Sequence, residues 1–198
     1  MNGFLEAVKN RRSRYAISGK SPVSDAEIVE IIQTAVKYAP TAFNSQGARL
    51  LVLFGAQHQK FWDLTKEILR ERIPADKFAS TDEKINSFAA GHGTVLYFEE
   101  WNTVAGLQAK FPSYKENFPI WACQSNGMLE YIIWTALEAE GLGASLQHYN
   151  PIVDEKVREV FGVPSSWKLL AQMPFGLPTA PAGEKTFMPL EERVIVLK

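Results

Sequence analysis

Pro40 and Gly47 bracket the stretch of sequence that most constrains the fold of this chain. The residue before a proline is pushed out of the α region, so a helix that precedes Pro40 has to end there. After Gly47 comes an apolar run, Leu50 to Phe54, which is typical of a buried strand. A helix therefore has to pass into a buried strand through a short polar loop.

That loop carries Thr41, Asn44, Ser45 and Gln46. The amide side chains of Asn44 and Gln46 each offer a donor and an acceptor on one flat group. Such groups suit the edge of a heteroaromatic ring such as a flavin, where N–H and carbonyl groups alternate. The alternative is a polar loop that caps its own turn, and for the loop alone this is the simpler interpretation.

A basic cluster, Arg11-Arg12-Ser13-Arg14, follows a short amphipathic helix with Phe4, Leu5 and Val8 on one face. Guanidinium groups match phosphate oxygens through two parallel hydrogen bonds, so the cluster is a candidate phosphate grip. The alternative is a solvated helix end whose cations interact with the helix dipole. For an isolated cluster the second interpretation is the simpler one.

Taken together, the two segments resemble the FMN-dependent nitroreductase family. Its members carry Arg-Arg-Ser after the first helix and, further along, an Ala-Pro-Ser/Thr-x-x-Asn-x-Gln loop. Glu140-Gly141-Leu142-Gly143, after a long helix, matches a glycine turn of the family, and Lys185 in the Pro-rich tail matches a late basic residue. The matches keep the family's order across nearly the whole chain. The run 145–151 also resembles the branch with the fungal fatty-acid-repression proteins and a copper-induced bacterial nitroreductase.

The resemblance implies an α+β fold with α/β/α layers: a central, mostly antiparallel sheet flanked by helices, in an intertwined homodimer with FMN at the subunit interface. It implies the cofactor-binding residues Arg11, Arg12, Ser13, Asn44, Gln46, Leu146, Gln147, His148 and Lys185. Arg11, Ser13 and Lys185 are expected at the phosphate, with Arg12 close by. Asn44 and Gln46 are expected at the ring or the ribityl chain, and the backbone of 146–148 near the flavin N5.

Some positions depart from the family's pattern. Tyr15 and Phe187 stand where members often carry a basic residue, and Gly47 stands where they often carry proline. FMN binding is still expected, but these departures bear on the detailed phosphate contacts and on substrate preference.

Periodicity and caps predict the other elements, as one mixed α/β domain over residues 1–198. Ser24 and Glu27 form a capping box, so a helix should run from Ser24 to Ala39 with Val23 stapled onto Ile28. Further helices are expected at 57–72, from Pro74 to about 90, at 119–140 and at 154–161, and strands at 50–54, 93–99, 145–147, 168–175 and 193–197. Residues 100–118 are expected to be irregular. The helix at 119–140 is apolar on most sides, so it should lie in a core or a subunit interface.

Composition and motifs exclude several classes of protein. A net charge of −1 gives no reason to expect a nucleic acid or an anionic membrane as partner, and no apolar run is long enough to span a bilayer. Cys123, the single cysteine, cannot form an internal disulfide, which fits a reducing cytoplasm. It lies beside Trp121 and Ala122, so we expect it to be buried. No signal peptide is apparent.

Two other kinds of site are not expected. Gly141-Leu142-Gly143 follows a helix and lacks a third glycine, so it does not make a Rossmann turn. The three histidines lack the spacing of a metal site. His148 is expected near the flavin, either as a hydrogen-bonded structural residue or as a proton donor.

The function that the resemblance implies is an NAD(P)H-dependent reductase of nitroaromatic or quinone-type acceptors, working by two hydride transfers through the flavin. No side chain is assigned a catalytic role, because the flavin carries the chemistry. The alternative is a non-catalytic flavin-binding protein with a redox-sensing or regulatory role.

Overall fold

The apolar runs after Gly47 and Gly93 pair side by side as β2 (Ala48–Phe54) and β3 (Gly93–Glu100) in the computed structural model of the chain, which describes residues 3–198. β5 (Trp167–Pro178) lies on the other side of β3 and also pairs with two short strands, β1 (Ile17–Ser18) and β4 (Gly143–Ala144). The strand order is β1-β5-β3-β2 with β4 on β5. All these pairings are antiparallel, which confirms the predicted sheet.

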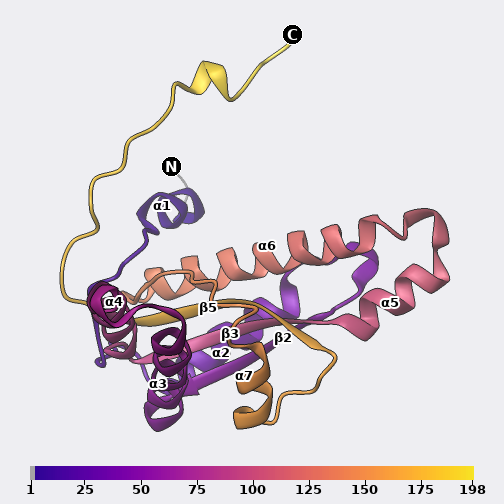
Figure 1. The fold of residues 1–198 in the computed structure, drawn as a ribbon. Helices are drawn as coiled ribbons and strands as arrows, with labels where there is room; N and C mark the ends of the chain where they lie inside the picture. Colours follow the sequence, from indigo (N-terminus) through magenta and orange to yellow (C-terminus); the bar gives the residue numbers. More distant parts are fainter. Residues whose placement is uncertain (1–2) are drawn as a thin grey trace.

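Helices cover both faces of the sheet (Figure 1). Because side chains alternate along a strand, Val95 and Tyr97 of β3 join a core with α2 (Asp25–Tyr38) and α6 (Asn117–Ala139). Leu96 and Phe98 point the other way, into a core with α3 (Gly55–Arg72), α4 (Ala79–Ala89) and α7 (Asp154–Phe161). The chain thus has the α/β/α layers that the sequence predicts.

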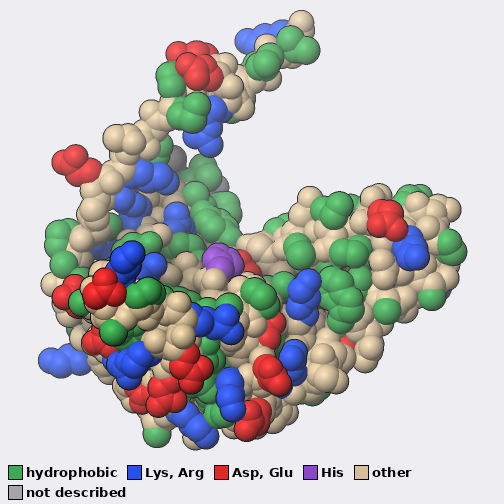
Figure 2. Space-filling model, viewed as in Figure 1, with side chains coloured by type: hydrophobic (Ala, Val, Ile, Leu, Met, Phe, Trp, Pro, Cys, Tyr) green, Lys and Arg blue, Asp and Glu red, His purple; other side chains and the backbone are tan. Residues whose placement is uncertain are grey.

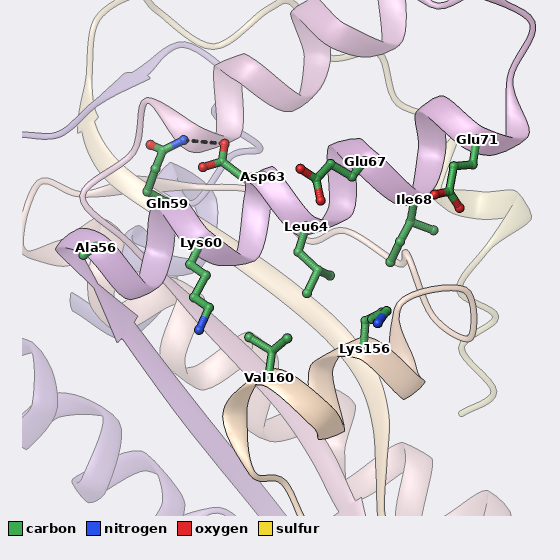
Figure 3. A pocket seen from close by; sticks show the side chains of 10 residues that line it. All are labelled: Ala56, Gln59, Lys60, Asp63, Leu64, Glu67, Ile68, Glu71, Lys156 and Val160. Atoms are coloured by element: carbon green, nitrogen blue, oxygen red, sulfur yellow. Dashed lines mark hydrogen bonds between the residues drawn. The ribbon is translucent and has the colours of Figure 1, made fainter.

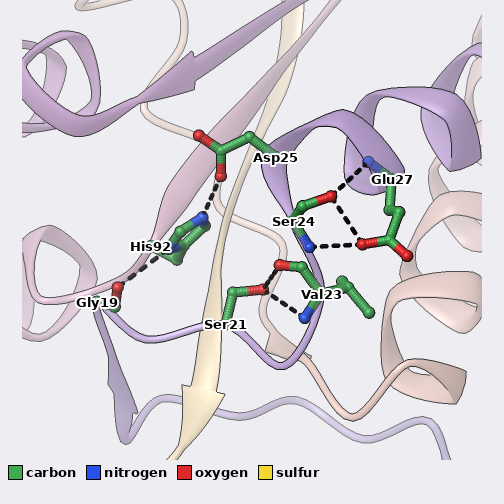
Figure 4. A network of polar contacts seen from close by, with 7 residues as sticks. All are labelled: Gly19, Ser21, Val23, Ser24, Asp25, Glu27 and His92. Carbon is green, nitrogen blue, oxygen red and sulfur yellow. Dashed lines mark hydrogen bonds and ion pairs between the residues drawn. The ribbon is translucent and has the colours of Figure 1, made fainter.

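The start of α2 is fixed by the capping box that the sequence predicts (Figure 4). The Ser24 hydroxyl accepts from the Glu27 N–H at 3.3 Å, and the Glu27 carboxylate accepts from the Ser24 N–H at 2.8 Å. Next to the cap, Asp25 meets the His92 ring at 2.6 Å, and the other ring nitrogen of His92 lies 3.0 Å from the Gly19 carbonyl. These contacts tie α2 to the turn before β3.

A buried polar network joins the helices of the other face to the sheet. His58 of α3 has Nε2 3.1 Å from the Ala89 carbonyl and Nδ1 2.8 Å from the Thr94 hydroxyl. A carbonyl only accepts, so Nε2 carries the proton of the neutral ring and Nδ1 accepts from Thr94. The Thr94 oxygen in turn accepts from the Trp62 indole at 2.9 Å. Desolvation by burial is the main reason that the pKa of His58 is lowered.

This lowered pKa predicts a loss of stability in mild acid. The unfolded chain, with a histidine pKa of about 6.5, binds the proton more readily than the folded chain. The contribution of neutral His58 is therefore complete above about pH 6.5 and is lost as the pH falls toward the folded pKa. We expect the difference in unfolding free energy between the wild type and His58→Gln, measured in urea, to shrink from pH 7 to pH 5. A constant difference would contradict the neutral, proton-donating role given to His58.

Residues 100–118 were predicted to be irregular, but this prediction is wrong. They contain the helix α5 (Trp101–Lys110). The Glu100 carboxylate caps its first turn by accepting from the Asn102 N–H at 3.0 Å. Only Val104 of this helix is buried, in a small core with Phe118 and Ala122 of α6. The apolar pattern was therefore too weak to read as a helix. Pro74 likewise does not open a helix directly: a short 3₁₀ turn at 75–77 comes first, and α4 begins at Ala79.

The C-terminal tail leaves the body of the chain and extends away from it (Figure 1). The strand predicted at 193–197 is wrong for the single chain, because no pairing of these residues occurs within residues 3–198 and Ile195 is 82% exposed. Cys123 is also exposed, not buried as expected, because the outer face of α6 has no cover in one chain. None of the helices in the described chain is long and apolar enough to cross a membrane.

Candidate functional site

The basic segment after α1 (Gly3–Asn10) is fastened to the end of the sheet. Ser13 forms a parallel bridge with Ala144, and the Arg14 N–H donates to the Ala144 carbonyl at 2.9 Å. Two segments that lie far apart in sequence thus run side by side. The bridge fixes Arg11–Ser13 relative to Leu146, Gln147 and His148, which follow Ala144 by two to four residues along the same edge.

Arg11 is held by stacking and keeps hydrogen-bonding capacity free. Its guanidinium lies 4.3 Å from the ring centroid of Trp134 and 5.8 Å from that of Tyr131, both on α6. These cation–π contacts orient the group without using its N–H donors. Its Nε is buried and finds no acceptor in residues 3–198. A buried donor on a charged group that lacks a partner in the chain fits an anionic ligand.

The neighbouring arginines are already engaged. Arg14 donates to the Glu138 carboxylate at 3.0 Å, and the pair is mostly buried; its Nε, like that of Arg11, is buried without a partner in residues 3–198, but its charge is already paired. Arg12 donates to the carbonyl of Gly183 in the tail. Arg11 is therefore the arginine of this cluster that is best placed to meet a phosphate.

The segment after β4 has two different edges. The N–H groups of Ser145, Gln147 and Tyr149 donate toward β5, to the Pro174 carbonyl, the Gln172 carbonyl and the Gln172 side chain respectively. In an extended chain the intervening N–H groups point the opposite way. Those of Leu146 and His148 have no acceptor within residues 3–198. They face the edge along which Ser13 pairs with Ala144.

The side chains of this segment differ from the expectation. Gln147 is buried, and its amide donates inward to the Ser145 hydroxyl at 3.0 Å, so its side chain does not reach toward a ligand. His148 is exposed and forms no hydrogen bond with the described residues, so the structural role considered for it is not seen in the single chain. The backbone N–H groups of Leu146 and His148 therefore present donors on the open edge.

The loop between α2 and β2 is backbone-strained. Phe43, Asn44 and Gln46 all have positive φ, at 57°, 50° and 50°. The left-handed region costs a non-glycine residue roughly 1 kcal/mol or more, least for asparagine, and such strain collects at functional sites. Asn44 and Gln46 are both exposed, and the Gln46 N–H donates to the Thr41 hydroxyl at 3.1 Å. The loop therefore holds both amide side chains out to solvent.

A buried carboxylate that the sequence analysis missed supports this loop from behind. Glu99 of β3 is 3% exposed and accepts from the Asn126 amide of α6 at 3.3 Å. Burial is the main cause that raises its pKa. Its carboxylate lies against Gly47, where a Cβ atom would meet Oε1 at 1.9 Å. This contact explains why a glycine stands where the family often has proline; a cross-element contact of this kind has no signal in one sequence.

We therefore expect Gly47→Ala to destabilise the fold. The added methyl group forces the buried Glu99 carboxylate to move, and overpacking of this kind costs about 1–3 kcal/mol. Gly106→Ala in α5 is the matched control, since its Cβ meets nothing within 4 Å and the change favours a helix. Urea unfolding should show Gly47→Ala below the wild type and Gly106→Ala at or above it. Equal stability of Gly47→Ala and the wild type would contradict the contact.

The loop does not meet the arginine segment within one chain. Phe43 packs on the rings of Phe118 and Trp121 near the start of α6, with centroids 5.4 and 6.0 Å away. Arg11 stacks on Trp134, thirteen residues further along this helix, which is roughly 20 Å at 1.5 Å per residue. The predicted site residues thus form two groups: the edge Arg11–Ser13 with Leu146–His148, and the loop with Asn44 and Gln46.

The arginine segment lies beside the tail, since Arg12 donates to the Gly183 carbonyl. Figure 2 shows the surface hollowed between the tail with α1 and the lobe formed by α5 and the start of α6, with Lys and Arg side chains gathered below the tail. Beside the loop, a cavity of about 220 Å³ is lined by Thr41, Gln46 and Ser125, among others. The fold thus leaves open space next to Gln46.

Comparison with known proteins identifies the family. The model of the nitroreductase family matches residues 8–177. The chain belongs to the nitroreductase family. It is 37% identical to HBN1 and 34% identical to nitroreductase FRM2, both of Saccharomyces cerevisiae, over 93% of each chain. Nitroreductase CinD of Lactococcus lactis, solved in complex with chloramphenicol, is 42% identical and superposes with a TM-score of 0.91 over 99% of this chain and 100% of its own.

All the predicted site residues except Lys185 lie within residues 8–177, which match the nitroreductase family model. Lys185 is exposed in the tail, and its ammonium lies 5.2 Å from the ring centroid of Phe187. Arg12 donates to the Gly183 carbonyl of the tail, and Lys185 follows Gly183 by two residues. No hydrogen bond or ion pair joins Lys185 to the other predicted site residues within residues 3–198.

The face of the sheet opposite α6 holds a second core, which includes Phe78 and Phe88. A cavity of about 580 Å³ also lies on that face, between α3 and α7 (Figure 3). Lysines and carboxylates of both helices line it, and Gln59 donates to Asp63 at its rim at 2.9 Å. It contains none of the predicted site residues.

Proposed function

We propose that this nitroreductase-family chain binds FMN along the edge formed by Arg11–Ser13 and Leu146–His148, and that it transfers hydride from NAD(P)H to a small aromatic acceptor. The observation that carries the proposal is the alignment of two unsatisfied donor sets on one edge. Arg11 offers a buried free Nε, and Leu146 and His148 offer two free backbone N–H groups. The bridge between Ser13 and Ala144 fixes one set relative to the other.

These donors fit FMN. The Arg11 guanidinium and the Ser13 hydroxyl suit a phosphate, and two N–H groups on an extended backbone suit the acceptor atoms of a flavin edge. The fold itself accommodates this cofactor: a nitroreductase-like protein of Desulfovibrio desulfuricans, 20% identical to this chain, was solved with FMN. FMN is preferred to FAD because the described chain has one phosphate grip and no second nucleotide-binding motif.

A homodimer would unite the two groups of site residues. One chain holds the phosphate edge and the amide loop far apart along α6, so Asn44 and Gln46 would contact an FMN bound by the partner subunit. The exposed apolar side chains of α6, among them Ile120, Met128 and Ile132, fit a subunit interface. The tail, whose residues Val194–Leu197 are apolar and exposed, would clasp the partner.

When bound, FMN supplies reversible hydride acceptance at N5. The chain's own residues bind and orient it: Arg11 neutralises the phosphate, and the N–H groups of Leu146 and His148 aim at the ring edge, where charge develops on reduction. The aromatic group around Phe43 offers a flat apolar wall for an acceptor ring. CinD has been solved with chloramphenicol and with 4-nitrophenol, so nitroaromatic compounds, with quinones beside them, are the proposed acceptors. The reducing cytoplasm is the proposed compartment.

Acceptor-driven turnover tests this proposal. Under anaerobic conditions, the FMN-loaded protein should oxidise NADH or NADPH continuously when 4-nitrophenol or a simple quinone is added. Without an added acceptor, it should oxidise only one NADH or NADPH per flavin. The alternative, a non-catalytic flavin-binding or redox-sensing protein, predicts no acceptor-driven oxidation even though FMN binds.

A further inference from the structure

The direction of the free N–H groups of Leu146 and His148 depends on how their segment is held to β5. Gly143 pairs with Gly176, Ala144 with Phe175 and Gln147 with Gln172, so one antiparallel register continues past the end of β4. In that register Tyr149 would face Leu170 and its N–H would donate to the Leu170 carbonyl. It does not: the Tyr149 N–H donates instead to the side chain of Gln172 at 2.7 Å.

Gln172 therefore replaces the missing rung of the ladder. Its own backbone N–H donates to the Gln147 carbonyl at 2.9 Å, and its carbonyl accepts from the Gln147 N–H at 2.7 Å. Its side-chain oxygen accepts from Tyr149, and its side-chain nitrogen donates to the Asn150 side chain at 3.3 Å. One residue thus holds the stretch 147–150 at four points, two of them through the side chain.

Because Gln172 is buried, its side chain depends on both of these hydrogen bonds. The residue is 0% exposed, so a side chain that lost either partner would leave a buried polar group unsatisfied. The hydrogen bond to the Tyr149 N–H fixes the peptide plane after His148, and the bond from the Gln172 N–H to the Gln147 carbonyl fixes the peptide plane that carries the His148 N–H. The bond to the Asn150 side chain holds the Gln172 amide in place. The His148 N–H thus lies between Gln147 and Tyr149, which are both hydrogen-bonded to Gln172. The Leu146 N–H lies just before Gln147.

We propose that Gln172 is a positioning residue, which aims the N–H groups of Leu146 and His148 at the edge of the flavin ring without touching the flavin itself. The proposal rests on the proposed function for the identity of the ligand. Preorganised donors stabilise charge that develops in a reaction only while their geometry is kept, and a displacement of about 1 Å can cost about a hundredfold in rate.

The test compares Gln172→Leu, which removes both side-chain hydrogen bonds, with Asn150→Ala, which removes only the bond to the side-chain nitrogen. Thr94→Val is the control, because it breaks hydrogen bonds of an equally buried polar side chain on the same face of the sheet as Gln172 without removing a hydrogen bond of residues 147–150. Three properties are measured in each protein: amide exchange of Tyr149, the midpoint potential of bound FMN, and the rate of flavin reduction by NAD(P)H at saturating FMN.

We expect Gln172→Leu to speed exchange at Tyr149, to make the FMN potential more negative, and to slow reduction by about tenfold to a hundredfold. Asn150→Ala should change all three in the same direction but less, which keeps the test decisive should Gln172→Leu fail to fold. Thr94→Val should lose stability but leave the three properties unchanged. If the Gln172 and Asn150 variants matched Thr94→Val in exchange and potential, the positioning role would be overturned.

Failure of the proposed function is distinguishable from failure of this inference. If the wild-type protein binds no FMN, the proposed function fails. Faster exchange at Tyr149 in the two variants would then still support the positioning of the segment by Gln172, and unchanged exchange would overturn it.

Discussion

Arg11→Ala is expected to weaken FMN binding by about tenfold to a hundredfold, whereas Arg14→Ala is expected to weaken it much less. The Arg11 guanidinium stacks on Trp134 and keeps its buried Nε free for a ligand. Arg14 is occupied by the Glu138 carboxylate at 3.0 Å. Hydrogen bonds to charged groups contribute about 1.5–3 kcal/mol, which corresponds to the stated loss in the dissociation constant.

The comparison is made by titrating each apoprotein with FMN and following flavin fluorescence at several salt concentrations. Arg14→Ala controls for the loss of a positive charge in the same cluster, and it should lower the melting temperature because it leaves Glu138 without its partner. Arg11→Lys should recover part of the affinity, since it keeps the charge but not the planar fork. Equal losses of affinity in Arg11→Ala and Arg14→Ala would mean that the phosphate grip has been misplaced.

Ile132→Asp is expected to abolish dimerisation and, with it, FMN binding. Ile132 lines an apolar groove of about 400 Å³ between α2 and α6, with Ile31, Tyr38 and Ala136 among its neighbours. A buried carboxylate without a partner is strongly unfavourable, so a dimer that covers this groove could not form. Because the proposed FMN site takes its amide loop from the partner subunit, the affinity for FMN should fall with the dimer.

Sedimentation velocity gives the result directly. The wild type should sediment at twice the 22.2 kDa mass of one chain, and Ile132→Asp as a monomer or as unfolded material. Ala56→Asp, which adds the same charge at an exposed position early in α3, should remain dimeric. A folded wild-type monomer at micromolar concentration would contradict the proposed interface.

The sheet and the helices on it could be predicted from sequence because their signals are local. The Ser24–Glu27 cap, the proline after Ala39 and the apolar runs of β2 and β3 each fix an element within a few residues. The predictions that were wrong concern the outside of the molecule. Cys123 and the tail at 193–197 were expected to be covered or paired, and in one chain nothing in residues 3–198 covers them.

The site divides in the same way. The arginine segment and the backbone at 146–148 were predicted from motif order, and the Ser13–Ala144 bridge links the two segments in the structure. Glu99 behind Gly47, the stack of Arg11 on Trp134, and the grip of Gln172 on Tyr149 could not be found. Each joins residues that are far apart in the chain, so each depends on tertiary structure that periodicity and spacing do not describe.

Titration of the purified apoprotein with FMN tests the central claim most directly. We expect saturation at one FMN per chain, with a change in flavin fluorescence and a higher melting temperature, because a ligand that binds only the folded state stabilises it. If saturating FMN leaves both the fluorescence and the melting temperature unchanged, the chain does not hold the flavin and the account fails.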